Sequence, residues 1–62
     1  MNPNLVRILD LVSQGRSNAE IGALLFLSEE TIKTYVKRIL REMGARNRAH
    51  AVAIAFQRGI LR

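Results

Sequence analysis

Apolar residues recur at helical spacing in four segments of the chain, and polar capping residues separate the segments. In the first segment the apolar positions are three and four residues apart, at Leu5, Ile8, Leu9 and Val12. Asn2 suits an N-cap, Pro3 suits the first helical position, and Gly15 suits the left-handed residue after the last turn. These signals predict a helix over residues 3–14.

A capping box marks the start of the second helix. Ser17 and Glu20 are three residues apart, so each side chain can accept a hydrogen bond from the other residue's free amide. We predict a helix over residues 18–25, with a close helix contact at Gly22, because glycine in a helix costs propensity. The residues expected on its apolar face are Ile21, Leu24 and Leu25.

The third predicted helix follows after a connection of only two or three residues. Ser28 suits its N-cap, Glu29 and Glu30 suit the positive end of the helix dipole, and Gly44 suits its end. The helix is therefore expected over residues 29–43. Its apolar stripe consists of Ile32, Val36, Ile39, Leu40 and Met43.

A fourth helix is predicted over residues 48–58, between an Asn47 cap and Gly59. Its core-facing residues are expected to be Ala51, Val52 and Ala55, with Ile60 and Leu61 packing back over its end. No segment alternates as a strand does. Residues 1–62 are thus expected to form one compact all-α domain of four helices, since 62 residues are too few for a second core.

Charge is distributed unevenly along the chain. Residues 1–30 carry two basic and four acidic side chains, a net charge of −2. Residues 31–62 carry eight basic side chains and one acidic side chain, a net charge of +7. This asymmetry is typical of a surface that binds a polyanion, although basic surface on a small domain also serves solubility.

A short capped helix, a tight connection and a longer basic helix form the helix-turn-helix arrangement, whose second helix enters the DNA major groove. On the helix over residues 29–43, the cations Lys33, Lys37 and Arg41 are spaced four residues apart. They repel one another unless an anion lies beside them, which favours an anionic partner. The expected base contacts are Lys33, Thr34 and Lys37. The expected phosphate contacts are Ser28, Thr31, Tyr35, Arg38, Arg41, Arg46 and Arg48.

Three of these assignments have equally plain structural alternatives. Tyr35 also suits the edge of the core, and Arg46 and Arg48 also suit a solvated surface. His50, the one histidine, is expected to be a polar helix-surface residue. A second apolar surface is expected on the fourth helix, formed by Ala49, Ala53 and Phe56. It is either a homodimer interface, or Phe56 simply completes the core.

Three stretches of the chain resemble the LuxR/GerE-type DNA-binding domain of bacterial response regulators and quorum-sensing receptors: residues 15–21, 27–33 and 39–52. The resemblance implies four helices, DNA recognition through residues 28–43 and dimer contacts through the fourth helix. Residues 1–7 lack the carboxylates usual in the family, so we expect no acidic anchor for Arg48 there. Tyr35, Gly22 and Glu42 also depart from the residues most frequent in the family.

These observations predict a cytoplasmic, bacterial transcription regulator that binds double-stranded DNA, as a dimer on an inverted repeat, with RNA polymerase as a further possible partner. Two alternatives share the fold: a protein-interaction adaptor on the transcription machinery, and the promoter-binding region of a sigma factor. We expect no enzyme, metal or cofactor, because the chain has no cysteine, no ligand cluster and no phosphate-binding glycine loop. We also expect no membrane span, because the longest apolar stretch is far too short.

Overall fold

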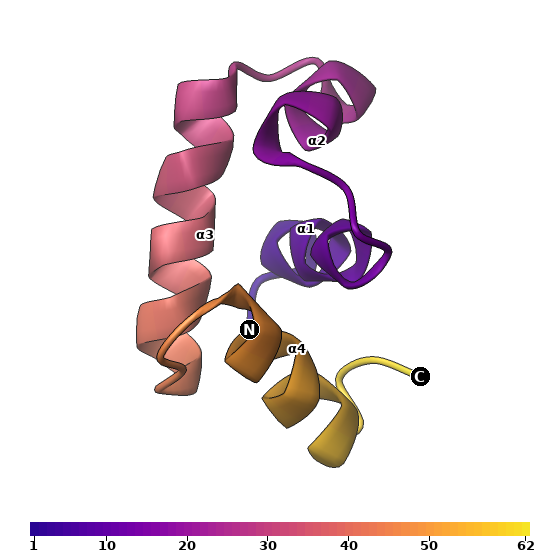
Figure 1. The fold of residues 1–62 in the computed structure, drawn as a ribbon, viewed down its shortest axis with the longest axis vertical. Coiled ribbons are helices and arrows are strands. Elements are labelled where there is room, and N and C mark those ends of the chain that lie inside the picture. Colours follow the sequence, from indigo (N-terminus) through magenta and orange to yellow (C-terminus); the bar gives the residue numbers. More distant parts are fainter.

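The computed structural model describes residues 1–62 and contains four helices and no strand. They are α1 (Pro3–Ser13), α2 (Asn18–Leu25), α3 (Glu29–Met43) and α4 (Arg48–Gln57). In Figure 1, α3 runs along one side of the molecule, and the other three helices are arranged along its inner side. The predicted all-α fold is confirmed, and α1 and α4 each end one residue earlier than expected. A membrane crossing would need a longer and more apolar helix than any of these four.

All four predicted N-caps are present. Asn2 Oδ1 accepts a hydrogen bond from the amide two residues later at 2.8 Å, and Ser28 Oγ and Asn47 Oδ1 accept from amides three residues later. In the capping box, the Ser17 amide donates to Glu20 Oε1 at 2.9 Å and Ser17 Oγ accepts from the Glu20 amide at 3.1 Å. The backbone and side-chain bonds to Ser17 hold the pKa of the Glu20 carboxyl below its ordinary value of 4.5.

The core contains side chains from every helix and from the C-terminal segment. α3 contributes the largest share and contacts each of the other helices. The buried residues are Leu5, Ile8, Leu9, Ile21, Ile32, Val36, Ile39, Met43, Ala51, Ile54, Ala55 and Leu61. Leu40, Val52 and Ile60 pack against them while partly exposed.

Two residues differ from the predicted core. Leu24 was expected to face inward but is 48% exposed, whereas Ile54 is buried and was not predicted. Leu24 lies about 60° around the helix from Ile21, and Leu25 lies only about 40° from it on the other side. An eight-residue helix packs along a narrow face, so Leu25 meets the core and Leu24 does not.

The turn between α2 and α3 lies directly against the backbone of α2. The Leu27 amide donates to Gly22 O at 2.8 Å, and a Cβ built on Gly22 would lie 2.5 Å from Leu27 O. The close helix contact expected at Gly22 is therefore present: besides this turn, the Glu29 amide nitrogen at the start of α3 would lie 3.5 Å from that Cβ. Phe26 ends α2 in the left-handed conformation, with φ of 58°, and its side chain is 94% exposed.

We expect Phe26→Gly to raise the free energy of unfolding by about 1 kcal/mol. The left-handed conformation costs a residue with a Cβ about 1–2 kcal/mol, and the greater freedom of glycine in the unfolded chain offsets part of the gain. Thermal and urea denaturation measure this change. Phe26→Ala is the control, because alanine keeps the backbone cost; an equal gain in both variants would contradict the explanation.

Candidate nucleic-acid interface

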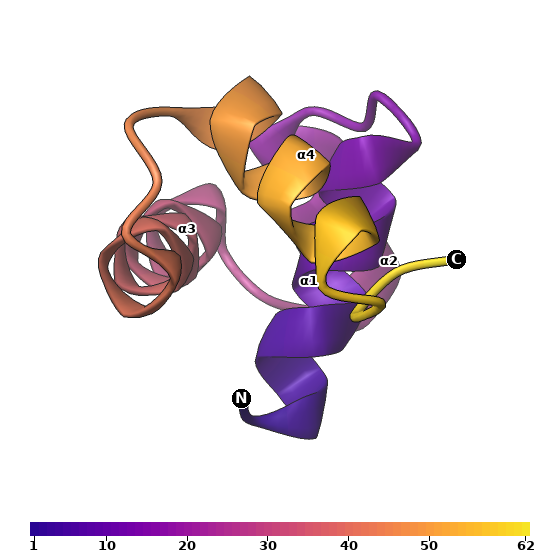
Figure 2. The ribbon, with the colours of Figure 1, turned by 90° about the horizontal axis from the view of Figure 1, so that it is seen from below.

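Helix α3 has one buried side and one uncovered side. Ile32, Val36 and Ile39 point into the core, while Lys33, Thr34, Lys37, Arg38 and Arg41 on the other side are exposed. Figure 2, which shows α3 nearly end-on, places no other helix against its outer side, in agreement with Figure 1. The structure therefore brings the predicted base contacts together on one free face.

The cations of this face differ in how they are paired. Lys33 Nζ lies 3.4 Å from Glu30 Oε1, and Arg38 Nε lies 3.1 Å from Glu42 Oε2. Both pairs are exposed to solvent, where such pairs contribute little to stability. The side chains of Lys37 and Arg41 form no ion pair or hydrogen bond within the chain. They are the cations of this face that are most available to an external anion.

Thr34 is more restricted than its sequence position indicates. Its hydroxyl donates to Glu30 O, one helical turn earlier, at 3.1 Å. The hydroxyl proton is therefore committed to the backbone, and Thr34 has no donor left for a base or a phosphate. What remains is its methyl group and the lone pairs of its oxygen.

Two predicted phosphate contacts meet at the start of α3. Ser28 Oγ and Thr31 Oγ1 lie 2.8 Å apart, and Ser28 Oγ also accepts from the Thr31 amide at 3.1 Å. Ser28 is exposed and Thr31 is half-buried. This arrangement places two hydroxyl groups at the positive end of the helix dipole.

Arg48 has an internal role that charge alone did not indicate. Its guanidinium donates to Asn18 Oδ1 and, at 3.0 Å, to Arg16 O, so it ties the start of α4 to the start of α2. Neither partner is a carboxylate. Arg46 is exposed, and its amide donates to His50 Nδ1 at 3.0 Å. His50 is half-buried, and its hydrogen bond closes the loop before α4. It is therefore more than the polar surface residue that was expected.

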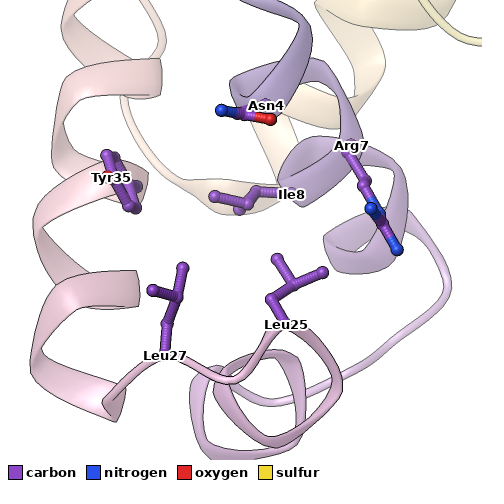
Figure 3. A pocket seen from close by; sticks show the side chains of 6 residues that line it. All are labelled: Asn4, Arg7, Ile8, Leu25, Leu27 and Tyr35. Atoms are coloured by element: carbon purple, nitrogen blue, oxygen red, sulfur yellow. The ribbon is translucent and has the colours of Figure 1, made fainter.

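Tyr35 lies at the edge of the core, which was one of its two predicted roles. It is half-buried and lines a cleft of about 240 Å³ between α1, α3 and the turn that joins α2 to α3. The side chains around this cleft are Asn4, Arg7, Ile8, Leu25, Leu27 and Tyr35 (Figure 3). A phosphate contact from its hydroxyl group stays a prediction.

The outer side of α4 carries the second apolar surface. Ala49, Ala53 and Phe56 are all exposed, and Phe56 is 49% exposed. Phe56 is not among the residues of the core, so it does not extend the core as one interpretation expected.

Comparison with known proteins identifies the family. The model of the family described as bacterial regulatory proteins, luxR family, matches residues 6–55. The chain belongs to the LuxR family. The resemblance seen in the sequence is thereby confirmed, and the structure has the predicted short helix, tight turn and longer helix.

Relatives of this LuxR-family chain include regulators from several bacteria. It is 39% identical over 56 residues to the uncharacterized transcriptional regulatory protein YxjL of Bacillus subtilis, covering 90% of this chain and 26% of that protein. It is 40% identical over 48 residues to the DNA-binding transcriptional activator DevR/DosR of Mycobacterium tuberculosis, covering 77% and 22%. The chain spans about a quarter of the length of these relatives.

A solved structure has the same fold as this LuxR-family chain. It is the response regulator ChrA of a heme-sensing two-component system, with a TM-score of 0.92 and 35% identity, covering 97% of this chain and 30% of ChrA. This TM-score over 97% of the chain shows that the agreement extends to the arrangement of all four helices.

Sequence reasoning missed one exposed residue on the uncovered side of α3 in this LuxR-family chain. Glu30 was assigned only to the helix dipole, yet it precedes Lys33, Thr34 and Lys37 by three, four and seven positions and shares their face. The same spacing rule that selected the lysines would have selected it. The Arg48 partners, by contrast, had no signal in the local sequence.

We expect Arg48→Ala to lower the free energy of unfolding by about 1–2 kcal/mol, because it removes two hydrogen bonds of a charged donor in a half-buried place. Urea denaturation of the free domain measures the change. Arg46→Ala removes the same charge from an exposed side chain and should change stability by less than about 0.5 kcal/mol. Equal effects of the two substitutions would contradict the internal role.

Proposed function

We propose that residues 1–62 form one domain that binds double-stranded DNA sequence-specifically, with α3 in the major groove, as part of a bacterial cytoplasmic transcription regulator and without catalysis. The observation that supports this most is the uncovered basic side of α3 directly opposite its buried stripe. A major groove accommodates one α-helix, and the polar residues of such a helix reach base edges.

In this proposal the residues nearest the start of α3 contact bases. Lys33 and Lys37 donate to guanine O6 and N7, and Thr34, which has no free donor, places its methyl group against a thymine methyl. The phosphates are bound by the residues that surround these three base contacts. They are Ser28, Thr31, Tyr35, Arg38, Arg41, Arg46 and the unused donors of Arg48.

Lys37→Ala should weaken binding to the preferred duplex by about 1–3 kcal/mol, because Lys37 is exposed and has no partner within the chain. Fluorescence anisotropy over a series of salt concentrations measures the affinity. For the parent chain, log affinity should fall linearly with log salt concentration.

The matched control is Arg58→Ala, which removes one positive charge at the far end of α4. It should reduce affinity much less than Lys37→Ala. If duplex DNA leaves the anisotropy of the parent chain unchanged at low salt, or if the two substitutions have equal effects, DNA binding through α3 is wrong.

We further propose that the domain binds an inverted repeat as a homodimer through the outer side of α4. Ala49, Ala53 and Phe56 form an exposed apolar strip there, and small residues allow two helices to approach closely. A two-fold dimer would present two copies of α3 to half-sites about one helical turn apart.

Phe56→Ser should abolish cooperative binding of the second chain to an inverted repeat and leave the affinity for a single half-site unchanged. The substitution removes the largest apolar side chain of the strip, and its exposure means that the fold is preserved. Native mass spectrometry of duplex complexes counts the chains. Gln57→Ser, at the neighbouring exposed position, is the control. One chain per inverted repeat at saturating protein would exclude the dimer.

A further inference from the structure

If α3 occupies the major groove as proposed, Glu30 lies at the start of the helix, where α3 first approaches the duplex. It is in the first turn of the helix, on the same face as Lys33 and Thr34, and its side chain is 85% exposed. Residues near the start of a recognition helix are the ones that reach base edges. Glu29, although adjacent in sequence, points about 100° away around the helix.

A carboxylate in this place is unfavourable beside DNA unless it accepts a hydrogen bond. Every phosphate repels it, and a solvent-exposed ion pair such as the one with Lys33 at 3.4 Å offsets little of that repulsion. An ionised glutamate is an acceptor only, so it needs a donor on the duplex. The major groove offers two such donors, cytosine N4 and adenine N6.

Cytosine satisfies this carboxylate better than adenine. Adenine presents the acceptor N7 beside its N6 donor, and N7 would repel the second carboxylate oxygen. Cytosine presents its N4 donor with no acceptor beside it on the same base. We therefore propose that Glu30 is a specificity-determining residue that accepts a hydrogen bond from cytosine N4 in the major groove. This inference rests on the proposed function, in which α3 occupies the groove.

The pairing of Glu30 with Lys33 strengthens the choice of a G·C pair. Guanine O6 and cytosine N4 are hydrogen-bonded partners, so they lie about 3 Å apart, close to the 3.4 Å between Lys33 Nζ and Glu30 Oε1. The ammonium group can donate to guanine O6 and N7 while the carboxylate accepts from N4. In an A·T pair the two acceptors, adenine N7 and thymine O4, lie on opposite sides of the N6 donor, so the lysine has no two adjacent acceptors such as guanine O6 and N7. The charged pair is therefore complementary to guanine opposite cytosine.

The test is selection of bound sequences from a pool of randomised duplexes, followed by anisotropy on single duplexes, with the parent chain and two variants of Glu30. The parent should prefer cytosine at one base pair of the half-site by about fivefold or more. Glu30→Ala should reduce that preference at least about twofold, to what Lys33 alone confers through guanine, and leave the other positions unchanged. Glu30→Gln should shift it towards adenine, because glutamine both donates and accepts and so matches N7 and N6.

Glu29→Gln is the matched control, because it removes the same charge one position away and should keep the parent's preferences. If the Glu30 variants bind all duplexes more tightly by one factor with unchanged preferences, Glu30 acts through charge alone and the inference is wrong. If the parent chain binds no duplex at low salt, the proposed function itself fails. The two failures are thus distinguishable.

Discussion

The apolar side of α3 is buried against the three other helices, and this burial decides which of its side chains face outward. Ile32 and Ile39 are almost completely inaccessible, so rotation of α3 about its axis would expose them and bury lysines instead. The direction of the basic face is therefore a consequence of the core. The affinity of that face for an anion depends in turn on its staying uncovered, as Figure 2 shows.

Local hydrogen bonds hold the helix-turn-helix unit in place where the core is small. A chain of this length buries a modest part of its surface, so caps and turns carry a large share of the net stability. The Ser17 capping box begins α2, and the hydrogen bond from the Leu27 amide to Gly22 O closes the turn. Together they set the angle at which α3 leaves the body of the domain.

The net charge overstates the number of cations that are free to bind a polyanion. Arg48 donates two hydrogen bonds within the chain, to Asn18 Oδ1 and Arg16 O. Lys33 and Arg38 each lie beside a carboxylate. The surface of α3 therefore carries two kinds of cation: those paired with a carboxylate, and those without a partner. Unpaired cations attract any phosphate, whereas a cation beside a carboxylate presents a donor and an acceptor together, which only some base pairs match.

The sequence by itself determined the four helices, their caps and the basic side of α3, because these depend on hydrogen bonds within about four residues and on helical periodicity. The tertiary structure alone decided the features that depend on packing angles or on distant residues. Leu24 is exposed and Ile54 buried because only the packing shows which edge of a helix meets its neighbours. Arg48 meets Asn18 across thirty residues, and Tyr35 faces α1 across a cleft, because folding brings together segments that no local pattern relates.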